Sequence, residues 1–232
     1  GIMIDYDFRI LQYNEFENLT RDLLQAEFDI YIESFKDGKD SGIDFRFGTV
    51  KGGRAIVQVK RYKDWKELKP QLEKEVNKVE KLNPERYILS TSAGLSPDNK
   101  STIKHMFNPY LVDTSDIYGR DDLNNLVGKH KDIEEKYYKL WLASTTVLQE
   151  IVNKDVRNWS RFELDSIKEQ ISTYVTNDSF QLAYEILKEH RYVIISGIPG
   201  IGKTTLARML VYNILADGYE EFVCIQCNLP YL

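Results

Sequence analysis

One short segment constrains the fold of this chain more than any other feature. Residues 197–204 read Gly-Ile-Pro-Gly-Ile-Gly-Lys-Thr, which is the G-x-x-x-x-G-K-T pattern of a phosphate-binding loop. Its glycines let successive backbone N–H groups converge on a phosphate, Lys203 adds positive charge, and the Thr204 hydroxyl can ligate Mg²⁺. The apolar run 192–195 predicts a buried strand before the loop, and residues 205–210 open a helix after it. This order of strand, glycine loop and helix predicts an α/β fold with a nucleotide site.

We expect the nucleotide, ATP with Mg²⁺, to contact the whole loop and the residue that follows it. The predicted contacts are Gly197, Ile198, Pro199, Gly200, Ile201, Gly202, Lys203, Thr204 and Thr205. A domain of this kind needs several more strands, one of which carries an acidic partner for the metal. Only one further strand, over residues 221–227, is predicted, so we expect the chain to be part of a longer protein.

The composition is that of a soluble globular protein. Hydrophobic residues make up 42% and charged residues 29% of the 232 residues, a length that favours one or two domains. No apolar run approaches the roughly 20 residues of a membrane span, and we expect no secretory leader because the first residues have neither a basic region nor a long apolar run. We therefore expect a cytoplasmic protein with no membrane partner. Cys224 and Cys227 are interpreted as buried strand residues, because zinc needs two more ligands at suitable spacing.

Three segments can be distinguished by their hydrophobic pattern. Residues 1–132 alternate helices and strands, 133–177 are a helical linker, and 178–232 are the first βαβ part of a P-loop NTPase domain. In the first segment the predicted helices are 11–27, 68–82, 101–106 and 120–130, and the predicted strands are 28–32, 43–47, 55–60, 86–91 and 110–112, with a polar loop at 36–42. In the later segments, residues 162–171 and 179–190 predict helices, with a break near 158–160.

A first chemical constellation lies in the 1–132 segment. Strand alternation places Gln58 and Lys60 on one face, and a hairpin between 43–47 and 55–60 can bring Asp44 beside them. An acid on one strand and a polar-x-Lys on the next is the core of a metal-dependent phosphodiesterase site. The carboxylate binds Mg²⁺, while the lysine orients the attacking water and offsets phosphate charge. Glu17, at the border of the first helix's apolar face, can complete this set.

Positive charge is concentrated around these residues, although the formal net charge of the chain is −5. The cations of this stretch are Arg46, Lys51, Arg54, Lys60, Arg61, Lys63, Lys66 and Lys69. We predict that Arg61 and Lys63 contact the phosphodiester backbone of DNA and that the other cations outside the site are solvated. Trp65 either stacks on a base or packs against the protein.

The residues 16–17, 42–44 and 58–61 resemble the Mrr-like branch of the PD-(D/E)xK restriction endonuclease superfamily. The sequence reads Phe-Glu, Gly-Ile-Asp and Gln-Val-Lys-Arg there, and this branch typically carries Gln where relatives carry Asp or Glu. The resemblance implies a mixed sheet flanked by helices. It implies Asp44 as the main metal ligand with Glu17 and Gln58, and Lys60 as the catalytic lysine.

Residues 180–187 and 191–207 resemble STAND-type NTPases, and 139–145 are similar to linkers in bacterial proteins that fuse an Mrr-like nuclease to such a module. The resemblance implies a Mg²⁺-dependent endonuclease for double-stranded DNA in defence against phage or foreign DNA. It also implies that the NTPase acts as a sensor or self-association switch. Residues 174–176 are a weaker candidate for contact with the adenine.

Two other functions remain open from the sequence. The chain can be an NTP-dependent DNA-binding regulator with an inactive nuclease fold, or a restriction subunit whose NTPase translocates DNA. A plasmid assay with and without Mg²⁺ separates the first alternative from a nuclease. The sequence beyond residue 232 separates the second, since helicase motifs indicate a motor.

Overall fold

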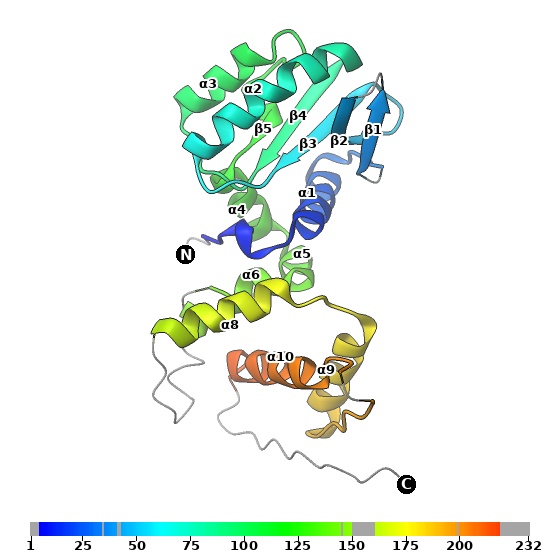
Figure 1. The fold of residues 1–232 in the computed structure, drawn as a ribbon, viewed down its shortest axis with the longest axis vertical. Helices are drawn as coiled ribbons and strands as arrows, with labels where there is room; N and C mark the ends of the chain where they lie inside the picture. Colours follow the sequence, from blue (N-terminus) through cyan, green and yellow to red (C-terminus); the bar gives the residue numbers. More distant parts are fainter. Residues whose placement is uncertain are drawn as a thin grey trace. The chain divides into compact units, whose positions relative to one another are not determined.

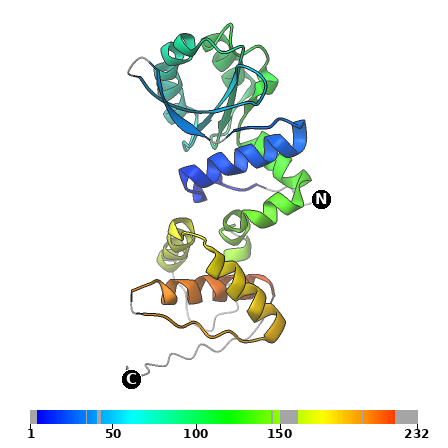
Figure 2. The same cartoon turned by 90° about the vertical axis from the view of Figure 1, so that its right-hand side faces the viewer.

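A computed structural model describes residues 5–33, 35–40, 43–144, 146–149, 161–198 and 200–218, without the side chains of residues 38–40, 43–45 and 161–164. The chain divides into two compact units, residues 1–141 and 142–232 (Figures 1 and 2). The first unit contains the β-sheet.

A five-stranded mixed sheet forms the centre of the first unit (Figure 1). In sheet order the strands are β1 (Lys36–Asp40), β2 (Ile43–Thr49), β3 (Ala55–Lys60), β4 (Arg86–Thr91) and β5 (Ile117–Tyr118). Strands β1, β2 and β3 pair antiparallel, as hairpins allow, whereas β3, β4 and β5 pair parallel and need helical crossovers. The mixed sheet flanked by helices predicted for this unit is thereby confirmed.

Helices cover both faces of this sheet. Those of the first unit are α1 (Tyr13–Phe28), α2 (Trp65–Leu82), α3 (Pro97–Met106), α4 (Arg120–Lys129), α5 (Lys131–Lys136) and α6 (Tyr138–Leu142), with 3₁₀ turns η1 (Phe8–Ile10) and η2 (Thr114–Asp116). Side chains alternate across β3, so Val57 and Val59 join the core under α1 and α4, while Ile56 joins the core under α2 and α3. Gln58 and Lys60, the polar residues of β3, share the face of Ile56 and therefore lie on the side of α2.

Capping residues fix both ends of helix α2. The Asp64 side chain accepts a hydrogen bond from the Glu67 N–H at 3.0 Å and begins α2. Asn83, with a left-handed φ of 45°, ends it, and its N–H donates back to the last turn. Between these caps the buried positions of α2 face β3 and β4.

The predicted strand over 28–32 is wrong. Helix α1 continues to Phe28, whose ring lies 5.9 Å from that of Tyr118, and Asp29 ends the helix with a φ of 50°. Of the predicted residues, Ile32 makes an isolated bridge to Val50. Conversely, the polar segment predicted as a loop contains β1, an edge strand, where polar residues face solvent at little cost.

The predicted strand over 110–112 is also wrong. Tyr110 accepts one hydrogen bond from the Tyr87 N–H at 2.9 Å, and Val112 is exposed. The neighbour of β4 is instead the two-residue β5. A single backbone bond does not make a ladder, so this apolar run packs without becoming a strand.

The described part of the second unit is mostly helical, and its residues 192–198 have no regular secondary structure. Its helices are α8 (Arg161–Thr173), α9 (Asp178–His190) and α10 (Lys203–Ala216), as predicted to within a few residues. Residues 192–195, predicted as a buried strand, pair with no strand among the described residues, and Tyr192 and Ile194 are exposed. The predicted break at 158–160 and the predicted strand 221–227, with Cys224 and Cys227, lie outside the described residues. In the described part of the chain, no helix is both long and apolar enough to span a bilayer.

Candidate nuclease site and phosphate loop

Gln58 and Lys60 lie on the same face of β3, as strand alternation predicts, and both meet helix α2. Gln58 is 1% exposed, and its Nε2 donates to Glu75 Oε2 at 2.9 Å. The Tyr87 hydroxyl donates to Gln58 Oε1 at 2.6 Å. Both ends of the amide are thus satisfied, and these bonds fix which way the amide points.

Glu75 is the centre of this polar group. Lys60 Nζ lies 3.2 Å from Glu75 Oε1, and Lys78 Nζ lies 3.4 Å from the same oxygen. We call Gln58, Lys60, Glu75, Lys78 and Tyr87 the Glu75 cluster. The Lys60 side chain is 14% exposed and that of Glu75 is 10% exposed, so the ion pair is largely shielded from solvent.

Sequence reasoning missed Glu75. Leu68, Leu72 and Val79 form the buried face of α2, and Glu75 lies on that face, three residues after Leu72 and four before Val79. An acidic residue on an otherwise apolar helix stripe is a signal that the sequence contained. The charge also acts on its surroundings: burial raises the pKa of the Tyr87 hydroxyl, and the negative charge of Glu75 raises it further.

Glu17 meets a different partner. Its side chain is 3% exposed, and Arg46 of β2 binds it with two nitrogens, Nε at 2.7 Å and a terminal nitrogen at 2.8 Å. This bidentate pair raises the pKa of the Arg46 guanidinium. One turn earlier on α1, the Tyr13 hydroxyl donates to the Val59 carbonyl at 2.6 Å. The α1 carboxylate is therefore braced against β2, whereas Gln58 and Lys60 bind a carboxylate of α2.

Asp44 lies in β2, where its backbone pairs with Lys39 of β1. Its side chain lies outside the described part of the structure. The described pairing of β2 with β3 is Gly48 with Val57 and Thr49 with Ile56. The approach of the Asp44 carboxylate to Gln58 and Lys60 thus stays a prediction.

A divalent metal suits the chemistry of the predicted ligands. Asp44, Glu17 and Gln58 offer carboxylate and amide oxygens, the ligands that Mg²⁺ prefers. Among the described residues, no three His, Cys, Asp or Glu side chains gather into a metal-binding group. Arg46 binds Glu17 and Tyr87 binds the Gln58 oxygen, so a metal would share these oxygens with their present partners or displace them.

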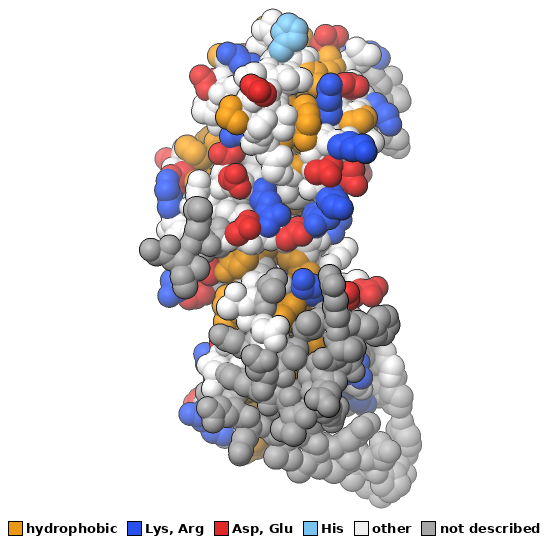
Figure 3. All heavy atoms as spheres, turned by 90° about the vertical axis from the view of Figure 1, so that its left-hand side faces the viewer, with side chains coloured by type: hydrophobic (Ala, Val, Ile, Leu, Met, Phe, Trp, Pro, Cys, Tyr) orange, Lys and Arg blue, Asp and Glu red, His pale blue; other side chains and the backbone are white. Residues whose placement is uncertain are grey.

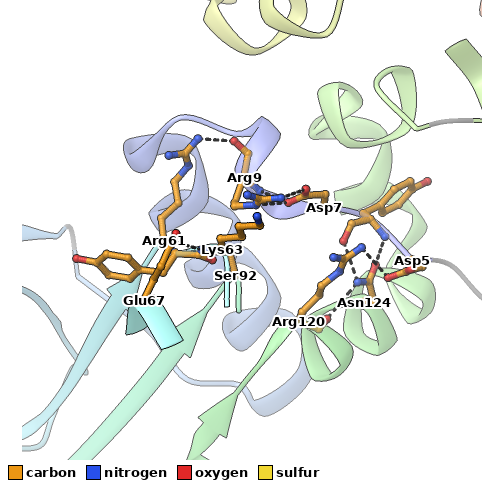
Figure 4. A network of polar contacts seen from close by, with 11 residues as sticks. Asp5, Asp7, Arg9, Arg61, Lys63, Glu67, Ser92, Arg120 and Asn124 are labelled. Carbon is orange, nitrogen blue, oxygen red and sulfur yellow. Dashed lines mark hydrogen bonds and ion pairs between the residues drawn. The ribbon is translucent and has the colours of Figure 1, made fainter. Parts of the chain in front are cut away.

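Arg61 and Lys63, the predicted DNA contacts, have different surroundings (Figure 4). Arg61 Nε donates to the Leu11 carbonyl at 2.8 Å, and a terminal nitrogen donates to the Arg9 carbonyl. Arg61 therefore holds the segment between η1 and α1. Lys63 is exposed, and its backbone N–H donates to Glu67 at 3.2 Å. DNA contact by either residue stays a prediction.

The basic stretch is not a uniform patch. Trp65 is half-buried and packs against the core under α2, which answers the choice between packing and stacking in favour of packing. One face of the first unit mixes blue cationic and red anionic side chains instead of gathering cations alone (Figure 3). Elsewhere in the first unit, the salt bridges Arg86–Asp116 and Lys100–Asp122 pair cations with acids.

The phosphate loop of the second unit has the backbone that its glycines predict. Gly200 and Gly202 have φ values of 85° and 88°, in the left-handed region that favours glycine. Gly202 is the N-cap of α10, and Lys203 Nζ donates to the Gly197 carbonyl. A Cβ added at Gly197 would lie 2.2 Å from Ile201 Cδ1, so the end of the Ile201 side chain would have to move. Pro199 lies outside the described residues.

The remaining predicted contacts of this loop are open to solvent. Ile198 and Ile201 are exposed, as are Thr204 and Thr205 at the first turn of α10. The N–H groups at this helix start and the Lys203 ammonium can receive a phosphate once Lys203 leaves the Gly197 carbonyl.

Comparison with known proteins separates the chain into two matches. Residues 8–119 match the family model Mrr_cat, restriction endonuclease, and residues 174–230 match nSTAND3, novel STAND NTPase 3. The uncharacterized protein y4cD of Sinorhizobium fredii is 41% identical over 227 residues, which cover 97% of this chain and 35% of that protein. The chain thus spans about a third of the length of this relative. No solved structure matches the chain significantly.

The first match covers the sheet, Glu17, Asp44 and the Glu75 cluster, and the second covers the phosphate loop and α10. The two matches occur in the order that the sequence patterns predict. The chain therefore carries a segment that matches a restriction endonuclease family model, followed by a segment that matches a STAND NTPase family model.

Proposed function

We propose that this protein is a Mg²⁺-dependent endonuclease for double-stranded DNA, controlled by its nucleotide-binding module. The observation that supports it best is the pair Gln58 and Lys60, held at the end of β3 in the segment that matches the restriction endonuclease family. Burying an amide and an ion pair on a strand otherwise lined by aliphatic residues costs folding free energy. Natural proteins place such groups in sites more often than in packing layers.

The roles follow from the chemistry of each residue. Lys60 keeps part of its side chain exposed, so its ammonium can orient a water and offset negative charge on the phosphate. Gln58 fixes the strand end through its two bonded ends. Mg²⁺, held by Asp44 with Gln58 and Glu17, would supply Lewis-acid activation of the phosphate and the water. Lys63 and Arg61 would contact the DNA backbone beside this site.

Control by nucleotide is the second half of the proposal. The phosphate loop and α10 would bind ATP with Mg²⁺, and binding in the longer protein would bring nuclease domains together by self-association. A nuclease under such control fits a defence role against phage or other foreign DNA, because uncontrolled cleavage would harm the host. The nSTAND3 match supports this half.

A plasmid assay tests the nuclease. Without nucleotide, the purified protein should nick supercoiled plasmid in Mg²⁺ at a basal rate and lose this activity when a chelator removes the metal. Lys60→Ala should reduce the rate by about 100-fold or more, the scale of losing one electrostatic group in a catalytic site. Lys69→Ala, an exposed lysine of α2, is the matched control and should cleave normally.

The assay also distinguishes the alternatives. Equal nicking by Lys60→Ala would contradict the site. DNA binding without cleavage under every metal condition would contradict the enzyme and favour a regulatory DNA-binding protein.

A further inference from the structure

The negative charge of the Glu75 cluster lies on helix α2 and not on strand β3. At position 58 of β3 this chain has a neutral amide, and the carboxylate of Glu75 faces it from α2. The distance from Gln58 Nε2 to Glu75 Oε2 is 2.9 Å. A glutamate at 58 would bring a second carboxylate to that distance, and two carboxylates so close do not both ionise cheaply. Positions 58 and 75 are thus coupled: one carries the amide and the other the acid.

Packing does not explain a carboxylate at position 75. Glu75 is 8% exposed on the face of α2 that also buries Leu68, Leu72 and Val79. A leucine there would extend the apolar core, and buried ion pairs often stabilise no better than apolar residues of the same size. What Glu75 does make is a contact with each polar residue of the β3 face: 3.2 Å to Lys60 Nζ and 2.9 Å to the Gln58 amide.

We propose that Glu75 is a positioning residue of the nuclease site, which from α2 fixes the Lys60 ammonium and the Gln58 amide. The inference rests on the proposed nuclease function and deepens it, because it adds a residue of a neighbouring helix to the site on β3. Lys60 is held by one buried oxygen, so its ammonium points along a fixed direction at the strand end. Lys78, 30% exposed, neutralises the outer side of the same oxygen.

Glu75→Gln removes the charge and keeps the size of the side chain. We expect single-turnover nicking to slow by roughly 10- to 100-fold, the usual cost of losing a residue that orients a site, with DNA affinity unchanged. Glu80→Gln, an exposed acid of the same helix, should cleave normally. Asp116→Asn removes another buried carboxylate, paired with Arg86 at 2.6 Å, and should lower the melting temperature while keeping the rate.

The exchange variant Gln58→Glu/Glu75→Gln puts the acid on β3 and the amide on α2. It should recover most of the rate lost in Glu75→Gln and most of the stability. Gln58→Glu alone should melt lower than the wild type because it places two carboxylates together. A role in stability alone would move the melting temperatures without this loss and recovery of the single-turnover rate, measured well below melting.

The outcomes are separable. If the wild type cuts and Lys60→Ala does not, but Glu75→Gln cuts at the wild-type rate, this inference is overturned and the nuclease stands. A folded exchange variant no faster than Glu75→Gln overturns the coupling on which the inference depends. If Glu75→Gln does not fold, Glu75→Asp provides the test. This variant keeps the negative charge on a side chain shorter by one methylene, and it should cut more slowly than the wild type. Wild-type speed in Glu75→Asp overturns the inference, and a wild type that never cuts overturns the proposed function and this inference with it.

Discussion

The two units of the chain treat their apolar strand-like segments in opposite ways. In the first, β3 lies between two strands, and Ile56, Val57 and Val59 are all buried. In the second, residues 192–195 precede the phosphate loop without a strand partner among the described residues, and Ile194 is 84% exposed. Both segments have the apolar composition of a central strand.

The difference shows what each chemical site depends on. The Glu75 cluster is assembled from β3, β4 and α2, so its distances are set by a sheet and a helix packed within one unit. The phosphate loop has its glycine backbone and the helix that follows it, but among the described residues no β-sheet packs beside it. We therefore expect the nuclease site to be the more rigid of the two.

The strongest prediction tests the part of the nuclease site whose side chain is not described. Asp44→Asn should slow plasmid nicking by on the order of 100-fold or more, because it removes the charged ligand proposed to hold the metal. Calorimetry should also show weaker Mn²⁺ binding. Asp37→Asn, an exposed acid of β1, is the control and should change neither property. Normal Mn²⁺ binding and cleavage by Asp44→Asn would contradict the account of the first unit, because its chemistry would then not depend on β2.

A second prediction tests the brace between α1 and β2. Arg46→Ala leaves the Glu17 carboxylate buried without its cation and should lower the free energy of unfolding by about 1–3 kcal/mol in urea titrations. The range is below that of a fully buried pair because the Arg46 side chain is 37% exposed. Arg54→Ala, an exposed arginine bound to the Asn83 carbonyl, should cost less than about 1 kcal/mol. Unchanged stability in Arg46→Ala would contradict the brace.

A third prediction concerns how the stability of the first unit responds to alkaline pH. Burial, with a further effect from Asp116, raises the pKa of Tyr118 to about 12, above the value of about 10 for an unfolded tyrosine. The folded state then holds the proton more tightly. Its contribution is complete below pH 10 and is lost as pH rises toward 12, by at most about 1.4 kcal/mol per pH unit. Urea midpoints should fall over this range, and less steeply in Tyr118→Phe; equal slopes would contradict a buried neutral hydroxyl.

Much of the first unit followed from period and turn signals. Alternation placed Gln58 and Lys60 on one face, and their shared contact with Glu75 confirms this. The amphipathic pattern predicted helix α2, but it did not predict that Glu75 contacts Gln58 and Lys60. A single acid on a helix does not indicate its partners until the neighbouring strand is known. The strand predicted at 28–32 is wrong because the helix continues to Phe28, whose ring contacts that of Tyr118, ninety residues later in the sequence. Among the described residues, 192–195 have no strand partner, and local composition does not reveal this.

One experiment compares the two units directly: the rate of supercoiled plasmid nicking in Mg²⁺ by the wild type, Lys60→Ala and Lys203→Ala side by side. The account predicts that Lys60→Ala loses cleavage, while Lys203→Ala cuts at the wild-type rate in the absence of ATP, because the phosphodiester chemistry resides in the first unit. Cleavage that survives in Lys60→Ala, or that disappears in Lys203→Ala without added nucleotide, would contradict it.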